Sequence, residues 1–117
     1  MTGLTSYHKG LAAEEQVVRH YARAGIEVCK RRWRGTRGEI DLIARRDDEV
    51  IFIEVKSSRT HAGAVSHLSR AQIARIFDTA AEFLEGEPKG QLTDIRIDVA
   101  LVDAMGRIEI IENAFAG

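Results

Sequence analysis

The sequence predicts an α/β fold, with a mixed central sheet flanked by helices, and three observations point to it. Residues 9–24 and 70–85 carry apolar side chains at helical spacing. Five shorter segments are rich in β-branched residues or alternate apolar with polar side chains. Their order is helix, three strands, helix, two strands, and the 117 residues, 44% of them hydrophobic, suit one domain over residues 1–117.

The first helix is expected from Lys9 to Ala24, after a frayed end at residues 1–8. Gly25 follows as a C-cap, because glycine adopts the left-handed conformation that ends many helices. Glu14 lies near the edge of the apolar stripe, about one turn before Val17. It either reaches toward the sheet or stays in solvent near the positive end of the helix dipole, and spacing alone leaves both open.

A strand is expected from Ile26 to Arg34, with apolar and polar residues alternating along it. Basic residues crowd its second half and the turn that follows, and they suit contacts with backbone phosphates: Lys30, Arg31, Arg32, Arg34 and Arg37. Trp33 in their midst either stacks on a base or packs beneath the arginine stems. Cys29 is expected to be a small buried residue without a thiolate role, since no His or Cys accompanies it at metal-ligand spacing.

Two neighbouring strands, Glu39–Ala44 and Val50–Ser57, are joined by a polar turn of hairpin length. In the second strand Glu54 and Lys56 share one face, and both faces are otherwise apolar. An acid and a lysine inside such a strand are costly unless they pair with each other or serve a metal. The first strand of the pair brings Asp41 to the same edge of the sheet.

This trio of side chains suits metal-assisted hydrolysis of a phosphodiester. Asp41 and Glu54, with the backbone carbonyl of Val55, are oxygen ligands of the kind that Mg²⁺ or Mn²⁺ prefers. Lys56 would orient the attacking water or stabilise the phosphate in the transition state. The alternative is structural, with an ion pair between Glu54 and Lys56 and with Asp41 capping a strand end. The pattern alone favours neither interpretation.

The second half of the chain supplies a loop, a helix and a hairpin. Residues 58–69 have no sustained pattern, and His61 and His67 within them are expected to face solvent or phosphate rather than to ligate a metal. Ser69 is a suitable N-cap for the helix over residues 70–85. Two alternating segments form the second hairpin: Thr93–Val102 and Arg107–Ile111.

Several of these segments resemble the PD-(D/E)XK nuclease motif in the form of the uncharacterised bacterial YraN-like family. That family is related to archaeal Holliday junction resolvases and more distantly to type II restriction enzymes. The motif itself corresponds to Gly38–Ile43 with Ile53–Lys56. Three further stretches resemble parts of the family: Gly10 with Ala13 and Glu14 in the first helix, Trp33 with Arg34 before the motif, and Asp94–Val99 in a C-terminal strand. The resemblance covers most of the chain and implies a restriction-endonuclease-like fold.

The resemblance also implies roles for individual residues. Carried over by position, the catalytic set is Glu14, Asp41, Glu54 and Lys56. Glu39 is expected to point away from Asp41 and to have a supporting or structural role.

A departure from the family occurs in the second helix. Relatives place a lysine one turn before the arginine that corresponds to Arg75, and here that position is Gln72. Glutamine still donates to a phosphate but brings no positive charge. The resemblance further implies a Mg²⁺-dependent endonuclease acting on DNA, including branched or junction DNA, and a homodimer, because a two-fold arrangement suits paired cuts.

The charge of the chain is unevenly distributed. Residues 1–75 hold 14 Lys and Arg against 9 Asp and Glu, whereas residues 76–117 hold 3 against 9, so the basic part contains the motif. This division favours a nucleic-acid surface, although solvated charges without a partner are the simpler explanation. Two other functions stay open: a non-catalytic nucleic-acid-binding protein with the nuclease fold, and a small interaction protein that uses its acidic C-terminal part.

No membrane partner is expected from the sequence. It contains no run of about 18 apolar residues and no basic segment followed by an apolar one at its N-terminus. The single cysteine, Cys29, excludes an intramolecular disulfide and suits a reducing compartment. We therefore expect a cytoplasmic protein.

Overall fold

The computed structural model describes residues 2–57 and 68–115, with side chains from residue 12 onward, and contains one five-stranded sheet flanked by helices. The strands follow one another across the sheet: β1 (Glu27–Arg34), β2 (Glu39–Arg46), β3 (Glu49–Ser57), β4 (Ile95–Val102) and β5 (Ile108–Ile111). The sheet is mixed, because β3 and β4 are parallel and every other pair is antiparallel. The helical elements are α1 (Thr2–Arg23), α3 (Arg70–Leu84) and the short 3₁₀ helix η1 (Gly90–Leu92). The predicted class, element order and mixed sheet are thus confirmed.

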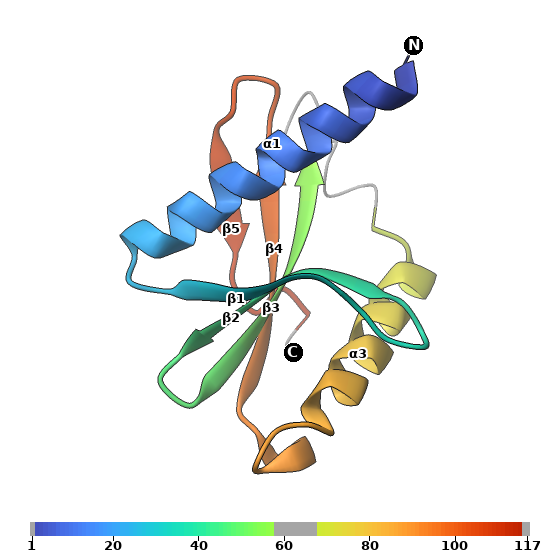
Figure 1. Cartoon of the computed structure of the whole chain (residues 1–117), viewed down its shortest axis with the longest axis vertical. Helices are drawn as coiled ribbons and strands as arrows, with labels where there is room; N and C mark the ends of the chain where they lie inside the picture. The colour runs from blue at the N-terminus through green and yellow to red at the C-terminus, as the bar shows by residue number, and fades with distance from the viewer. Residues whose placement is uncertain (1, 58–67, 116–117) are drawn as a thin grey trace.

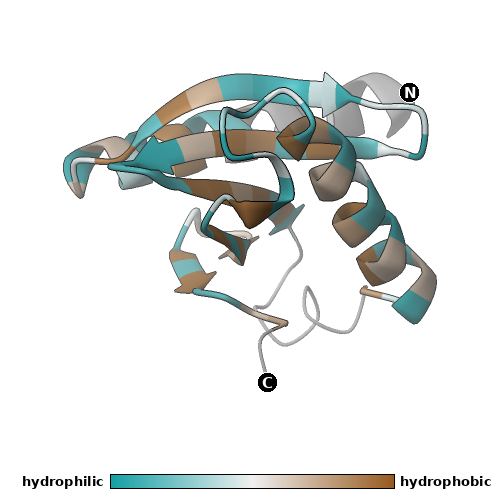
Figure 2. Ribbon diagram, turned by 90° about the horizontal axis from the view of Figure 1, so that it is seen from below, coloured by the Kyte–Doolittle hydropathy of each residue, from teal (hydrophilic) through white to brown (hydrophobic). Residues whose placement is uncertain are grey.

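The two long helices cover opposite faces of the sheet. α1 runs across one face, where Val17 and Tyr21 pack against Ile51 and Ile53 of β3. On the other face, Ile76, Ala80 and Leu84 of α3 pack against Val50 and Phe52, and apolar residues follow the central strands (Figure 2). The alternation along β3 that the sequence predicts is therefore correct. It also carries Glu54 and Lys56 to the α3 face.

The first helix starts earlier than its apolar stripe. α1 begins at Thr2, so the expected frayed end is wrong for residues 2–8. No proline interrupts this stretch, and a helix can extend through residues that add nothing to its apolar stripe. The end is as predicted: Gly25 has a φ of 81°, and the Ile26 N–H donates to the Tyr21 carbonyl at 2.9 Å, as in a Schellman cap.

Strand β1 is less regular than its sequence suggests. Its register against β2 shifts between Val28 and Lys30, and Arg32 has a φ of 51°. A bulge of this kind adds one residue to one strand and turns the following side chains, so simple alternation fails there. Cys29, expected to be buried, is exposed on this edge strand, with its Sγ 3.3 Å from the Ile43 carbonyl oxygen.

The acid Asp98 of β4 is fully buried and fully hydrogen-bonded. It accepts from the Tyr21 hydroxyl at 2.7 Å, from the Asn113 N–H at 3.0 Å, and from two nitrogens of Arg96 at 2.9 and 3.1 Å. Burial and the neighbouring carboxylate raise the pKa of Tyr21. This network ties α1, β4 and the chain after β5 together, and it leaves Asp98 no free lone pair for a ligand.

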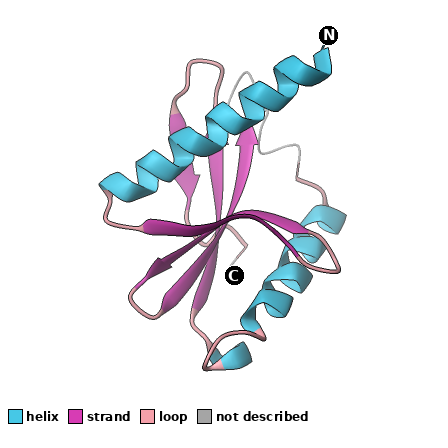
Figure 3. Cartoon of the chain, viewed as in Figure 1, coloured by secondary structure: helices cyan, strands magenta, loops and turns pink. Residues whose placement is uncertain are grey.

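The remaining predictions about local structure divide into two groups. The β4–β5 hairpin and the Ser69 cap are confirmed, the latter as a capping box with Gln72. The predictions about His61 and His67 lie outside the described residues. No helix in residues 2–57 or 68–115 is long and apolar enough to cross a membrane. Figure 3 shows the strong twist of the sheet, which brings the β1–β2 turn to α3.

Candidate active site at the end of β2 and β3

Asp41 and Glu54 meet where β2 and β3 stop pairing. The ladder between these strands runs from Arg46–Glu49 to Leu42–Ile53 and ends there, whereas β3 stays paired to β4 as far as Ser57. Just beyond, Asp41 Oδ2 accepts a hydrogen bond from the Val55 N–H at 2.8 Å. The Asp41 side chain thus takes the place of a strand carbonyl and is fixed beside Glu54.

Glu54 is partly buried, and one of its carboxyl oxygens lacks a partner in the described part of the chain. Its Oε2 atom is inaccessible and accepts no hydrogen bond from the side chains or backbone that the structure describes. Burial raises the pKa of Glu54 most, and the hydrogen bond and negative charge of Asp41 raise it further, while the charge of Lys56 lowers it. Glu54 therefore keeps its proton at neutral pH when nothing else compensates its charge. Gln16 Oε1 is also unpartnered, but a neutral amide is less costly to bury than a carboxylate.

Only one part of the structural alternative for this trio is observed, namely that Asp41 caps the end of a strand through its hydrogen bond from Val55. Lys56 and Glu54 do not form an ion pair within 4.0 Å in the described part of the chain, although they interact through space. Instead both line a recess of about 160 Å³ between β3 and α3, together with residues from both sides: Gly38, Glu39, Leu68, Gln72, Arg75 and Ile76. Lys56 is thereby available to a molecule that enters the recess.

Glu39 belongs to this recess, which corrects the expectation that it faces away from Asp41. Glu39 lines the recess together with Glu54, and its Oε2 lies 3.1 Å from Arg34 Nη2. The negative charge of Glu39 also contributes to raising the pKa of Glu14 and of Glu54. Glu39 therefore shares the electrostatic environment of the site.

Glu14 of α1 points to the sheet rather than to solvent. Its Oε1 accepts a hydrogen bond from Arg32 Nε at 3.1 Å, and only 16% of its side chain is exposed. Burial raises its pKa most; Arg32 opposes this, and the charges of Asp41 and Glu39 add to it. Glu14 therefore interacts electrostatically with Asp41, although the Glu14 side chain does not line the recess that contains Glu54.

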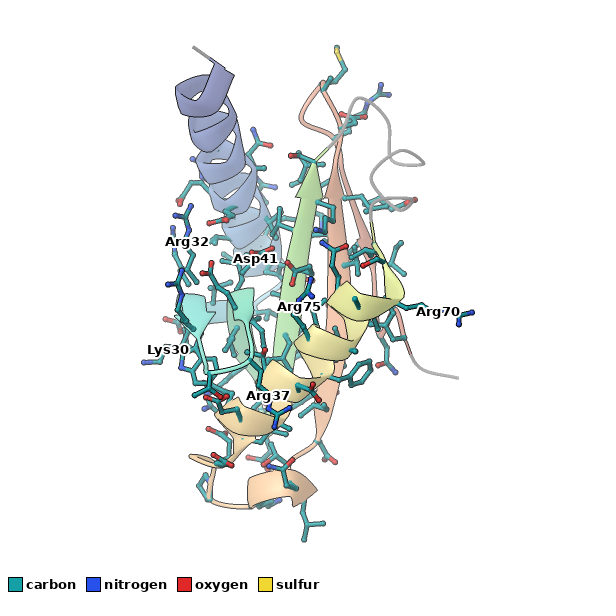
Figure 4. The ribbon with its side chains drawn as sticks, turned by 90° about the vertical axis from the view of Figure 1, so that its right-hand side faces the viewer. Lys30, Arg32, Arg37, Asp41, Arg70 and Arg75 are labelled. Carbon is teal, nitrogen blue, oxygen red and sulfur yellow. The ribbon has the colours of Figure 1, made fainter. Side chains whose placement is uncertain are left out.

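The basic residues predicted to contact nucleic acid are spread over one side of the molecule. In Figure 4, Lys30 and Arg32 lie on one side of Asp41, and Arg75 and Arg70 on the other. Most of the guanidinium groups on β1 and its turn have carboxylate partners: Arg31 with Glu15 at 2.7 Å, Arg34 with Glu39 at 3.1 Å, and Arg37 with Asp78 at 3.9 Å. Much of the positive charge is thus compensated within the chain.

Trp33 and Gln72 have structural contacts beside their predicted roles. Trp33 is half-buried and packs edge-on against Phe83 of α3, with ring centroids 5.2 Å apart. The side-chain oxygen of Gln72 accepts from the Ser69 N–H at 3.0 Å, which leaves its amide hydrogens directed to other partners. Gln72 and the exposed Arg75 both line the recess, so contact with a phosphate stays a prediction for them and for Trp33.

The β1–β2 turn is clasped to α3 by Glu82, a contact that sequence reasoning missed. The Glu82 carboxylate accepts from the Thr36 N–H at 2.9 Å and from the Thr36 hydroxyl at 2.8 Å. A Cβ at Gly35 would lie 2.8 Å from Glu82, and one at Gly38 would lie 3.0 Å from Thr79 Oγ1. The two glycines at this turn are the signal that indicates close approach of another element. The clasp fixes the start of β2 relative to α3.

The donor set suits a hard divalent cation. The described side chains contain no group of three or more His, Cys, Asp or Glu arranged to hold a metal. Two carboxylates and a backbone carbonyl are nevertheless enough for Mg²⁺, which keeps several waters. Asp41 and Glu54 stand together, Val55 lies between Glu54 and Lys56, and the buried Oε2 of Glu54 lacks a partner. A cation at this position would supply that partner.

Comparison with known proteins identifies relatives along the whole chain. Residues 13–102 match the family described as "Uncharacterised protein family UPF0102". A UPF0102 protein of Cereibacter sphaeroides strain KD131 is 65% identical over 116 residues, 99% of either chain. Those of Ruegeria pomeroyi and Dinoroseobacter shibae are 56% and 43% identical, covering 97% and 95% of this chain and 92% and 83% of theirs. The names of these relatives state no activity.

Proposed function

This chain belongs to the uncharacterised protein family UPF0102, and we propose that it is a metal-dependent nuclease that hydrolyses phosphodiester bonds in DNA. The observation that carries the proposal is the buried, unpartnered Oε2 of Glu54 beside Asp41. Two adjacent carboxyl groups, one of them under-satisfied, destabilise a fold unless something binds between them. Perturbed acids in a recess are typical of functional sites. We also infer membership of the PD-(D/E)XK nuclease superfamily from the motif.

Each residue of the site has a separate task in this proposal. Asp41 and Glu54, with the Val55 carbonyl, would hold Mg²⁺ or Mn²⁺. When bound, the cation supplies positive charge for the scissile phosphate and lowers the pKa of water. Lys56, in the same recess, orients the attacking water or stabilises charge on the phosphate. Glu14 supports the set from α1 through its interaction with Asp41.

The substrate would be held across the side of the molecule seen in Figure 4. Gln72 and Arg75 line the recess from α3, and Lys30 and Arg32 of β1 lie on the opposite side of Asp41. Guanidinium groups on both sides of the acids suit the phosphates that flank a scissile bond. A homodimer that makes paired cuts in branched or junction DNA follows from the family resemblance and is part of the proposal.

A non-catalytic nucleic-acid-binding protein is the second candidate. It is favoured by exposed basic residues such as Lys30 and Arg75, which can contact phosphates whether or not a cation is bound at the acids. It offers no reason for the inaccessible Oε2 of Glu54 to lack a partner among the described residues. The nuclease is therefore the function that we infer.

The test is cleavage of labelled linear duplex, single strand, flap and four-way junction with Mg²⁺, with Mn²⁺ and with EDTA. We expect cation-dependent products from the parent protein and a loss of at least about 10³-fold in rate for Asp41→Ala and Glu54→Ala. Asp48→Asn, an exposed acid in the β2–β3 turn, is the matched control and should cut like the parent. DNA affinity should be equal or higher in the site variants, because repulsion of the phosphates is reduced. Cutting by either site variant at the parental rate would refute the proposed site.

A further inference from the structure

We propose that Glu39 and Glu14 are shared carboxylates, held by arginines in the empty protein and drawn to the cation when it binds, so that cation binding releases Arg34 and Arg32 for DNA phosphates. The inference rests on the proposed function and adds its regulation: cation and DNA would bind cooperatively. It also assigns to Glu39 a role in the site that the sequence did not suggest.

The first observation is that two ion pairs border the acidic centre. Arg34 Nη2 lies 3.1 Å from Glu39 Oε2, and Glu39 lines the same recess as Glu54. Arg32 Nε lies 3.1 Å from Glu14 Oε1 on the α1 side. The charge of Asp41 raises the pKa of Glu14, and the charge of Glu39 raises the pKa of Glu54. Both acids therefore interact electrostatically with the centre. Each pair therefore joins one potential cation ligand to one potential phosphate ligand.

The second observation is that two other ion pairs of the same cluster lie apart from the centre. Arg31 pairs with Glu15 at 2.7 Å, and Arg37 pairs with Asp78 at 3.9 Å. Neither acid lines the recess of Glu54, and neither is among the charges that shift the pKa of Glu14 or Glu54. These pairs have the same chemistry and the same sequence neighbourhood, so they serve as internal controls.

The pair between Arg34 and Glu39 is weak enough to exchange partners. The side chains of Arg34 and Glu39 are 79% and 36% exposed, and exposed ion pairs stabilise a protein little. A divalent cation beside Asp41 and Glu54 attracts Glu39 more strongly than one guanidinium does, and a phosphate attracts the guanidinium in turn. Because coupling between two ligands is reciprocal, DNA must raise cation affinity by the same factor by which the cation raises DNA affinity.

The first experiment measures the fluorescence anisotropy of a labelled duplex with the full chain, in EDTA and in saturating Ca²⁺, with intact DNA verified on a gel. In the parent we expect Ca²⁺ to tighten DNA binding by at least about fivefold. Glu39→Gln should bind DNA more tightly than the parent in EDTA and should lose most of the Ca²⁺ effect. Glu15→Gln, which releases Arg31, should also tighten binding in EDTA but should keep the Ca²⁺ effect.

The second experiment measures Mn²⁺ affinity by calorimetry without DNA. Arg34→Gln removes the competitor of the cation for Glu39, so its affinity for Mn²⁺ should rise by about threefold or more. Arg37→Gln removes the same charge three residues further along the chain and should leave Mn²⁺ affinity near the parental value. Equal effects of the two substitutions would show only the general influence of net charge and would overturn the proposal.

The outcomes separate this inference from the proposed function. If Mn²⁺ binding is unchanged in Asp41→Asn, no cation is held at this site and the proposed function fails first. If that substitution abolishes Mn²⁺ binding, but Glu39→Gln keeps the parental Ca²⁺ effect on DNA, the site stands and the shared carboxylates are refuted. Loss of the Ca²⁺ effect in Glu39→Gln but not in Glu15→Gln supports both.

Discussion

Two acids on adjacent parallel strands, the fully buried Asp98 of β4 and the partly buried Glu54 of β3, differ in how their charge is compensated. Asp98 lies opposite Ile53, one residue before Glu54, and accepts four hydrogen bonds from three different residues. Glu54 has two carboxyl groups whose charges act on it, Asp41 and Glu39, and its inaccessible Oε2 atom has no hydrogen-bond partner among the described residues. The completeness of its hydrogen bonding therefore distinguishes a structural acid from a functional one.

The difference follows the two faces of the sheet. Asp98 points to the α1 face, where Tyr21 closes over it, and it holds the fold together. Glu54 points to the α3 face, where a recess separates it from Gln72 and Arg75. We expect substitutions on the first face to act on folding, and those on the second to act on ligands.

The largest effect on stability is expected for Asp98→Asn. The substitution removes the nearest carboxylate to Arg96, whose side chain is only 9% exposed. Asp98 lies 2.9 Å from it, whereas Glu49 and Glu112 lie 3.8 Å away. Breaking a buried ion pair by removing one partner costs about 3–5 kcal/mol in the free energy of unfolding. Urea denaturation followed by circular dichroism measures it, with Asp48→Asn as the control. A loss below about 1 kcal/mol would mean that Asp98 is no more structural than a surface acid.

A smaller effect of opposite sign is expected for Glu54→Gln. Because the folded protein holds the Glu54 proton more tightly than the unfolded chain does, the free energy of unfolding falls as pH rises from the ordinary value of 4.5 toward about 9. Glutamine cannot ionise, so this variant should be more stable than the parent at pH 8 by about 1–3 kcal/mol. At pH 4 the two should be nearly equal. Thermal unfolding without divalent cations, at both pH values, makes the measurement.

If Glu54→Gln destabilises the protein at pH 8 as much as at pH 4, Glu54 is a structural acid like Asp98. The comparison between the two faces would then break down. The same pair of measurements on Asp98→Asn is the matched control, since its destabilisation should persist at both pH values.

The smallest effect is expected for Gln72→Lys on the recess. A lysine there adds a charge-assisted contact to phosphate, worth about 1 kcal/mol or fivefold in DNA affinity. It should also steepen the dependence of log K on log salt by about 0.9. Ala74→Lys, exposed on the same helix but outside the recess, is the control. Equal gains from both substitutions would place the DNA elsewhere.

Hydrophobic periodicity was sufficient to predict both helices and the faces of β3. Val50 and Phe52 meet α3 whereas Ile51 and Ile53 meet α1, as expected for two opposite faces of one strand. Spacing and motif also brought Asp41 to Glu54, because neighbouring strands of a hairpin must pair. These are local or nearly local relations along the chain.

Relations between distant segments could not be predicted in this way. The bulge at Cys29 depends on how β1 fits β2, and no residue type in that strand requires it. The partner of Arg32 is Glu14, 18 residues earlier, and that of Thr36 is Glu82, 46 residues later. The number of basic residues in the sequence therefore overestimates the positive charge of this surface, because the sequence does not show which carboxylates pair with the arginines. The misplacement of Glu39 is different in kind, since regular alternation already places it beside Asp41.

The most direct test of the central claim is the number of protons released when Mn²⁺ binds. Calorimetric titration at pH 7 in buffers of different ionisation enthalpy gives this number without any substrate. Because a ligand must lose its proton to bind a metal, we predict release of about one proton per ion, and a value near zero for Glu54→Gln if that variant still binds. Mn²⁺ binding by the parent without proton release, or the same release from Glu54→Gln, would contradict the account.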